Sequence, residues 1–156
     1  MRKENIIVLH NIRSVQNVGA MFRTADAVGI NKIYLSGYTP APVDRFGRKR
    51  RDFAKSALGA EDYVKWEFKK SLSTIMRSLR REGFQIIAIE QDKKSVDYKK
   101  VKLAKRNAFI VGTEVTGIPK NILKKCDVIA EIPMHGKKES LNVSVALGVV
   151  LFGVLN

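Results

Sequence analysis

Apolar and polar positions follow two periods along the chain, and together they predict strands that alternate with helices. Runs of consecutive apolar residues, typical of buried strands, lie at 5–10, 32–35, 85–89, 108–111 and 128–132, with a weaker run at 63–68. Helical spacing is found over 17–28, ended by Gly29, and over 71–81, and further helices are expected near Pro119 and over 141–155. This order favours an α/β fold with a mainly parallel sheet flanked by helices.

The expected last helix, Leu141 to Leu155, has almost no polar side. A helix that is apolar all round has to be covered on every side, and one sheet covers only one of them. Two arrangements meet this requirement. Either the helix is buried within the monomer, or a second subunit covers its outer side.

The chain is strongly basic, with 29 Lys and Arg against 15 Asp and Glu, a formal net charge of +14 and a pI of about 10.1. Such an excess indicates a polyanionic partner such as nucleic acid, although high lysine content or solubility explains it as well. The densest cluster is a loop after Pro40 and Pro42, which we expect to bind RNA. Its basic residues are Arg45, Arg48, Lys49, Arg50 and Arg51. Arg77, Arg80 and Arg81 on the second helix are further candidates for contacts with an RNA backbone.

Cysteine content and hydropathy bear on the compartment. Cys126 is the single cysteine, so no intrachain disulfide forms, which fits a reducing compartment. No signal peptide is evident at the start of the sequence, and the most apolar stretch is shorter than the roughly 20 residues of a membrane span. We expect a cytoplasmic protein whose residues 1–156 form a single domain, because composition does not change along the chain.

The first motif segment, residues 11–25, combines a helix start with an outward-facing arginine. Arg23 shares a helical stripe with the small Ala20 and Ala27, which leaves room for a ligand. Asn17 stands at the expected helix start, where free N–H groups suit an anion. A solvated surface arginine is the alternative interpretation of Arg23.

The second motif segment, residues 109–119, is an apolar strand followed by a turn with Gly112, Glu114 and Gly117. Ligands of open α/β sheets bind beyond the carboxyl ends of strands, and glycine allows the backbone to approach them closely. An ordinary strand-to-helix turn explains the glycines equally well, whereas Glu114 falls where a ligand would lie.

The third motif segment, residues 132–146, leads from a strand through a loop into the last helix. Ser140 is expected to be the N-cap of that helix. Capping by Ser140 leaves Asn142 unexplained, since it is a polar residue at the start of an otherwise apolar helix.

Several classes of site are absent from the sequence. There is no Walker loop, no G-x-G-x-x-G after a strand and no G-x-S-x-G. His10, His135 and Cys126 lack metal-ligand spacing, so no metal site is expected.

In this order and spacing, the three motif segments resemble those of the SpoU/TrmH class of RNA methyltransferases, within the SPOUT superfamily. The resemblance extends from His10 to Val154, and Lys55 to Glu61 (KSALGAE) also resembles the short members of the class. It implies an α/β domain whose carboxy-terminal part forms a trefoil knot. Many relatives carry an additional amino-terminal RNA-binding domain, and we expect none here, so the basic surface of the domain has to capture the RNA.

The resemblance also implies a cofactor, a partner and an oligomeric state. The cofactor is S-adenosylmethionine, held largely by backbone groups of the second and third segments, and the protein is a homodimer with its active site at the interface. The matching cofactor-binding positions are Gly112, Ile132, Met134 and Leu141, together with Ile89 at the end of the preceding strand.

Position by position, the catalytic set implied by the resemblance is Arg23, Asn17, Glu114, Ser140 and Asn142. The expected reaction is methyl transfer from S-adenosylmethionine to a ribose 2′-hydroxyl of transfer or ribosomal RNA, with transfer RNA favoured. Because a guanidinium stays protonated, we expect Arg23 to bind the phosphate beside the target ribose, with a phosphate oxygen as proton acceptor. Asn17, Ser140 and Asn142 would hold the ribose, and Glu114 would hold Arg23 or the nucleotide.

Two other functions are compatible with the sequence. One is a non-catalytic RNA-binding or ribosome-assembly factor that keeps the fold, and the other is methylation of an RNA base instead of the ribose. Binding of S-adenosylmethionine separates the first from an enzyme, and resistance of the modified linkage to alkaline cleavage separates the second from ribose methylation.

Overall fold

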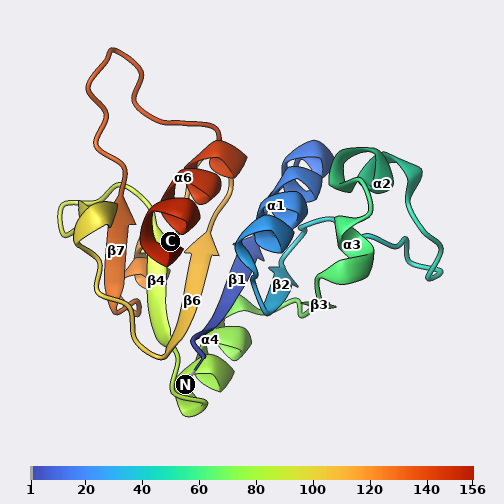
Figure 1. The fold of residues 1–156 in the computed structure, drawn as a ribbon, viewed down its shortest axis with the longest axis horizontal. Coiled ribbons are helices and arrows are strands. Elements are labelled where there is room, and N and C mark those ends of the chain that lie inside the picture. The colour runs from blue at the N-terminus through green and yellow to red at the C-terminus, as the bar shows by residue number, and fades with distance from the viewer. Residues whose placement is uncertain (1) are drawn as a thin grey trace.

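All strands in the described part of the protein run in the same direction. In the computed structural model, which describes residues 2–156, seven strands form one parallel sheet in the order β3-β2-β1-β6-β4-β7-β5 (Figure 1). The strands are β1 (Glu4–His10), β2 (Lys32–Ser36), β3 (Trp66–Phe68), β4 (Gln85–Ile89), β5 (Val96–Asp97), β6 (Arg106–Val111) and β7 (Val128–Glu131). The expected mainly parallel α/β sheet is therefore confirmed.

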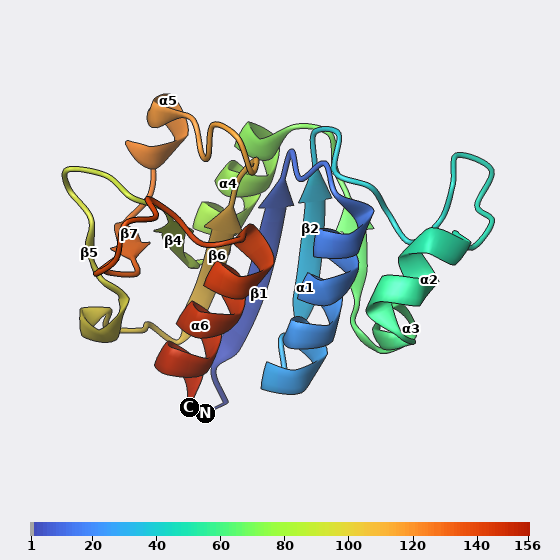
Figure 2. The same cartoon turned by 90° about the horizontal axis from the view of Figure 1, so that it is seen from above.

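Helices cover both faces of the sheet. They are α1 (Val15–Val28), α2 (Arg51–Ala57), α3 (Ala60–Tyr63), α4 (Leu72–Arg81), α5 (Lys120–Leu123) and α6 (Val143–Leu155), with a 3-10 turn, η1, at Tyr98–Lys100. Figure 2 shows α1 and α6 side by side on one face and α4 and α5 on the other. The short helices α2 and α3 lie beyond α1, on the β3 side of the sheet (Figure 1).

The alternation of side chains along the strands gives the sheet two buried faces. Ile7 and Leu9 of β1 belong to the core beneath α1 and α6, whereas Ile6 and Val8 of the same strand belong to the core beneath α4 and α5. Both faces of a parallel sheet have to be covered, which explains why the strands read as continuous apolar runs.

The position of β6 between β1 and β4 determines which segments meet. Since all strands are parallel, the chain leaves β1, β6, β4 and β7 at the same edge of the sheet. The first, second and third motif segments follow β1, β6 and β7 there.

Several predicted boundaries were wrong. The run at 63–68 is a strand only from Trp66, because Tyr63 ends α3, and α1 begins at Val15, two residues before Asn17. The last helix begins at Val143 and not at Leu141, because Asn142 is its N-cap. The short elements α2, α3 and β5 were missed, and Arg51, expected in a loop, begins α2.

Among residues 2–156, no helix has both the length and the apolar character needed to cross a membrane. The trefoil knot implied by the resemblance stays a prediction, because strand order alone does not define how the chain passes through itself.

Close packing of α1 on α2 gives a stability prediction. A Cβ at Gly19 would lie 2.9 Å from the backbone nitrogen of Ala57, so Gly19→Ala has to push α2 away. We expect the free energy of unfolding to fall by about 1–3 kcal/mol, measured by urea denaturation at a fixed protein concentration. Gly148→Ala in α6 is the matched control, because its Cβ would meet Thr24 only at 3.9 Å. Equal losses in both variants would contradict this account of the α1–α2 contact.

Candidate active site

The first and second motif segments are joined by a carboxylate. The backbone N–H of Arg13 donates to Glu114, at 3.2 Å from Oε1 and 3.4 Å from Oε2. Arg13 precedes α1, and Glu114 follows β6, so this contact fixes the entry to α1 relative to the end of the neighbouring strand. Glu114, predicted from the sequence as a site residue, therefore lies at the junction of two segments.

The first and third segments are joined by two asparagines. The side-chain amide of Asn142 donates to Oδ1 of Asn17 at 3.3 Å. One residue belongs to the first turns of α1 and the other precedes α6, and 125 positions separate them in sequence. Asn17 and Asn142, both expected from the sequence to hold the ribose, thus lie in contact within a single chain.

Asn142 also has the capping role that spacing predicted for Ser140. Its Oδ1 accepts from the N–H of Ser144 at 2.9 Å and of Val145 at 3.4 Å, and from the Ser144 hydroxyl at 2.6 Å. Asn142 is therefore the N-cap of α6, and the prediction that Ser140 caps this helix was wrong. The side-chain oxygen of Asn142 is thus used in capping, and its side-chain NH2 group makes the contact with Asn17.

The turn of the second segment is closed and supported from β4. Gly117 adopts φ of 69°, and its N–H donates to the carbonyl of Thr113 at 2.9 Å. A Cβ at Gly112 would lie 2.7 Å from the Gly117 carbonyl, so this turn needs glycine at both positions. Glu90, directly after β4, accepts from the N–H of Ile118 at 3.0 Å and of Gln91 at 2.9 Å.

Sequence reasoning missed Glu90. The available signal was its position, since a carboxylate follows the buried strand 85–89 where the second and third segments also lie. Tyr38, which follows β2, was missed as well. Hydrogen bonds with the Thr113 and Arg13 side chains lower the pKa of Tyr38, so this phenol lies against the first and second segments.

A hollow of about 80 Å³ lies between the end of β4 and the third segment. The residues that line it include four of the five predicted cofactor positions, Ile89, Ile132, Met134 and Leu141, together with Ser140. Gly112, the fifth, lies in the adjacent turn and does not line the hollow. Within residues 2–156, no backbone hydrogen bond involves Met134 or Leu141, so these peptide groups are free to bind a ligand.

Arg23 lies apart from this hollow within its own subunit. It is exposed, and within the described residues it forms neither a salt bridge nor a side-chain hydrogen bond. Six positions along an α-helix correspond to a rotation that places Arg23 about 120° around α1 from Asn17. Asn17 faces α6, whereas Arg23 lies closer to the side on which Gly19 meets α2.

The anion site expected at the start of α1 differs from the prediction. Ser14 is the N-cap, and its hydroxyl accepts the N–H of Asn17 at 3.1 Å. The backbone N–H of Asn17 is thus already hydrogen-bonded to Ser14, and only the side chain of Asn17 is available to the site.

A family match covers nearly the whole chain and accounts for this geometry. The family model described as "SpoU rRNA Methylase family" matches residues 4–152. The chain belongs to the SpoU family of RNA methylases. The expectation from the sequence is thereby confirmed.

Curated relatives of this SpoU-family chain are longer than it is. It is 32% identical over 154 residues to the tRNA (guanosine(18)-2′-O)-methyltransferase of Aquifex aeolicus, covering 97% of this chain and 68% of that protein. It is 30% identical to the enzyme of the same name in Escherichia coli K12, covering 94% of this chain and 60% of that protein. A 23S rRNA (guanosine-2′-O-)-methyltransferase of Neisseria meningitidis is 32% identical, with 94% and 56% covered. The chain thus spans little more than half of several relatives.

Solved structures agree with the family. The AdoMet-bound rRNA methyltransferase from Sinorhizobium meliloti superposes with a TM-score of 0.88 at 27% identity, covering 98% of this chain and 56% of that one. The Aquifex aeolicus TrmH/SpoU tRNA modifying enzyme gives 0.84 at 28% identity, with 99% and 75% covered. AdoMet, bound in that Sinorhizobium meliloti structure, is S-adenosylmethionine, the methyl donor expected for this chain from the sequence.

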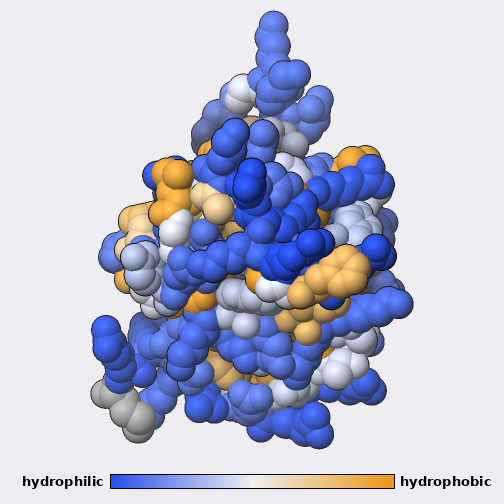
Figure 3. Space-filling view, turned by 90° about the vertical axis from the view of Figure 1, so that its right-hand side faces the viewer, coloured by the Kyte–Doolittle hydropathy of each residue, from blue (hydrophilic) through white to orange (hydrophobic). Residues whose placement is uncertain are grey.

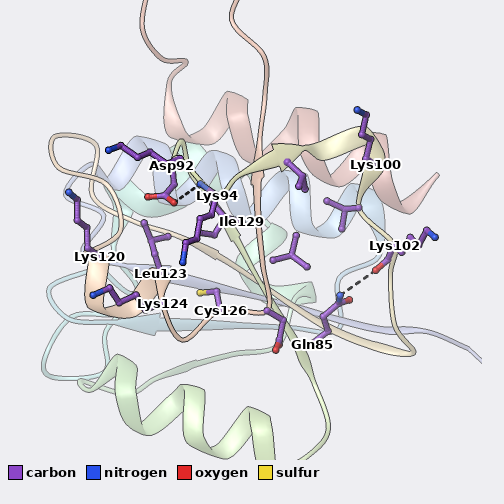
Figure 4. Close-up of a pocket in the computed structure, with 15 residues that line it drawn as sticks. Gln85, Asp92, Lys94, Lys100, Lys102, Lys120, Leu123, Lys124, Cys126 and Ile129 are labelled. Carbon is purple, nitrogen blue, oxygen red and sulfur yellow. Dashed lines mark hydrogen bonds between the residues drawn. The ribbon is translucent and has the colours of Figure 1, made fainter.

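A larger hollow of this SpoU-family chain lies elsewhere. It measures about 850 Å³ at the β7–β5 edge, with an apolar floor that includes Leu123 and Ile129 and a rim of lysines (Figure 4). Burial raises the pKa of Cys126 on its floor to about 11, so the thiol is neutral at pH 7. None of the residues predicted in the three motif segments lines this larger hollow, so it does not coincide with the candidate site.

The two roles of Asn142 can be separated by substitution. Asn142→Ala removes the cap of α6 and should lower the free energy of unfolding by about 1 kcal/mol. Asn142→Asp keeps an acceptor for the Ser144 and Val145 amides but loses the donor to Asn17, so its stability should stay near that of the wild type. Methyl transfer should fall in both variants. The capping assignment fails if chemical denaturation shows the aspartate variant to be as unstable as the alanine variant.

Proposed function

We propose that this chain transfers the methyl group of S-adenosylmethionine to a ribose 2′-hydroxyl of RNA, at a site completed by a second copy of the chain. The observation that carries the proposal is the convergence of the three motif segments. Glu114 binds the Arg13 amide, Asn142 binds Asn17, and both contacts lie at the sheet edge that holds the hollow of Ile132 and Met134. Relatives named for tRNA and for rRNA match equally well, and we take tRNA as the first substrate to test.

The residues around the small hollow suit the methyl donor. Ile89, Ala130 and Leu141 offer apolar walls to an adenine ring, and the free peptide groups of Met134 and Leu141 offer a donor and an acceptor to its edge. When bound, the cofactor supplies a methyl group that its sulfonium charge has already activated. The protein then has to orient the ribose oxygen and provide for loss of its proton.

A second subunit is proposed on the evidence of α6. Leu147, Val150 and Leu151 are buried against the sheet, but Val145 and Phe152 on the outer side are 50% and 48% exposed. The monomer therefore does not cover this apolar helix. A symmetric partner packed on α6 would cover it, and would bring an Arg23 side chain to a site that lacks one in its own subunit.

The assigned roles follow from charge and contacts. A guanidinium is a planar cation that matches the geometry of phosphate, so Arg23 binds the phosphate next to the target ribose and places a phosphate oxygen to accept the hydroxyl proton. Asn17, Ser140 and Asn142 hold the ribose. Glu114 was expected to hold Arg23 or the nucleotide, but its partner in the structure is the Arg13 amide, so we assign it to holding the start of α1.

The basic loop is only partly free to bind RNA. Arg48, Lys49 and Arg50 form ion pairs with Asp44, Asp62 and Asp52, at 3.0, 3.5 and 2.7 Å respectively. In the described part of the chain, Arg45 and Arg51 have no such partner. Figure 3 shows the side of the molecule on which α2 and α3 lie, and hydrophilic residues dominate this face.

The helix α4 offers fewer RNA contacts than expected. Arg80 pairs with Asp127 at 3.2 Å and also donates to the carbonyl of Lys125, so it ties α4 to the start of β7. In addition, α4 covers the face of the sheet opposite to α1 and α6 (Figure 2). We therefore assign Arg80 a structural role.

Substitution of Arg23 tests the catalytic assignment. Arg23→Ala should lower kcat by roughly a hundredfold or more, because the variant has no preorganised charge beside the reacting group. Arg23→Lys should recover only part of this, since an ammonium does not bind phosphate in a bidentate manner. Calorimetry should find unchanged binding of S-adenosylmethionine in both. Wild-type turnover of the alanine variant would remove Arg23 from the mechanism.

Mixing of two inactive variants tests the shared site. Arg23→Ala chains mixed with Asn142→Asp chains should regain about a quarter of wild-type activity after subunit exchange, because half of the dimers then hold one intact site of two. If both residues act within one subunit, every chain carries a defect and the mixture stays inactive. That outcome would contradict the shared site while leaving the reaction itself in place.

Salt dependence tests the RNA surface. Arg45→Gln combined with Arg51→Gln should weaken RNA binding and reduce the slope of log K against log salt by roughly 0.7–0.9 for each phosphate that the protein no longer neutralises. Arg2→Gln with Arg106→Gln is the control of equal charge, at the amino ends of β1 and β6, away from the site. Fluorescence anisotropy over a salt series gives both slopes. Equal reductions would show that the loop binds RNA only through overall charge.

A further inference from the structure

Residues 43–49, here called the basic hairpin, form an ordered loop. Val43 and Lys49 pair in an antiparallel bridge at its base. Asp44 holds the turn from inside, since its Oδ1 accepts from the N–H of Phe46 at 2.9 Å and of Arg48 at 3.0 Å. Its other oxygen accepts from Nε of Arg48 at 3.0 Å, and Gly47 takes the positive φ of 78° that the turn requires. The tip of the hairpin is thus presented in a defined conformation.

The tip presents an aromatic ring together with two cations. Phe46 is 66% exposed. The guanidinium carbons of Arg45 and Arg48 lie 4.8 and 5.0 Å from the centroid of its ring. Because the Phe46 ring is mostly exposed, it contributes little to the hydrophobic core of this chain. The arginine side chains beside it are of the type that binds phosphate.

The setting of Phe46 differs from that of a neighbouring exposed aromatic residue. Tyr63 is 77% exposed, but it ends α3 directly after Glu61 and Asp62, where RNA phosphates would be repelled. The combination of an open ring and adjacent positive charge at Phe46 is the one that binds single-stranded nucleic acids.

The hairpin is also anchored to the edge of the sheet where the site lies. The chain leaves β2 beside that site, where the Tyr38 side chain lies against Arg13. Thr39 then fixes the base of the loop, since its buried hydroxyl donates to the carbonyl of Leu9 at 3.0 Å and accepts from the N–H of Ile12 at 3.1 Å. From there the loop projects outward past α2 (Figures 1 and 2). An RNA held at the site can therefore extend along the loop to its tip.

We propose that Phe46 stacks on an unpaired base of the substrate RNA while Arg45, whose guanidinium has no carboxylate partner among the described residues, binds a phosphate next to that base. The proposal rests on the proposed function, because it names a contact of the same RNA. Stacking on an aromatic ring needs an open base face, which a base within a duplex does not offer. The basic hairpin would then distinguish RNA with an accessible loop from continuous duplex, at a distance from the methylated ribose.

The experiment uses a stem-loop RNA that carries the fluorescent adenine analogue 2-aminopurine in its loop, and a perfect duplex of the same length. Phe46→Leu should lower affinity for the stem-loop by about tenfold, as expected when one base–aromatic stack is removed, and abolish the quenching of 2-aminopurine. Affinity for the duplex should change by less than about twofold, because both arginines remain. Phe46→Trp should restore stem-loop affinity and quenching.

Two controls make the result specific. Tyr63→Leu removes a more exposed aromatic residue and should leave both affinities unchanged. Thermal unfolding of Phe46→Leu should match the wild type, since the ring is mostly in solvent. Equal losses of affinity for stem-loop and duplex, or no loss for either, would overturn the proposal.

Failure of this proposal can be told apart from failure of the proposed function. If Phe46→Leu binds the stem-loop like the wild type, and the wild type methylates RNA, only the stacking contact is wrong. If the wild-type protein binds neither RNA, the proposed function and the stacking contact both fail.

Discussion

The parallel pairing of β6 between β1 and β4 is the constraint on which the site depends. Because every strand points the same way, the chain leaves the sheet at one edge after each of the central strands. Residues more than a hundred positions apart then become neighbours, as Arg13 and Glu114 do. An antiparallel β6 would keep the core but would carry the glycine turn of Gly112 to the opposite edge. The fold thus provides the meeting of the motif segments before any ligand is bound.

Much of this arrangement could be predicted from the sequence, because strands buried on both faces leave a strong apolar signal. The five strong runs all proved to be strands, and the helices α1 and α4 were found from their apolar stripes. The predictions that were wrong or missing concern features that depend on the positions of a few atoms. The choice between Ser140 and Asn142 as the cap of α6 is decided by which side chain reaches the Ser144 amide, and spacing alone does not determine this. Very short elements such as α3 and β5 were missed for a related reason, since their stability comes from the neighbours on which they pack.

The candidate site was predicted less evenly than the fold. Residues of the motif segments could be named, and most cofactor positions do surround one hollow. Glu90 could not be identified, because its role is to hold a turn that is distant in sequence. The ion pairs that occupy Arg48, Lys49 and Arg50 were equally invisible, since a run of basic residues does not reveal which carboxylates fold back onto it. Counting charge therefore overestimated how much of the loop is free to bind RNA.

Under the proposed function, the contact between Asn17 and Asn142 would link stability to substrate binding. The side-chain carbonyl oxygen of Asn142 caps α6, which leaves its side-chain NH2 group as the part that can bind a ligand. In the structure, Nδ2 of Asn142 donates to Oδ1 of Asn17 in a solvent-exposed hydrogen bond of 3.3 Å, which is long for such a bond. Exchanging such a bond for one to a ribose hydroxyl costs little, because the net contribution of an exposed neutral hydrogen bond is only about 1 kcal/mol. The cap would keep Asn142 in place while its side-chain amide changed partner, so the proposed ribose contact would need no reorganisation of either helix.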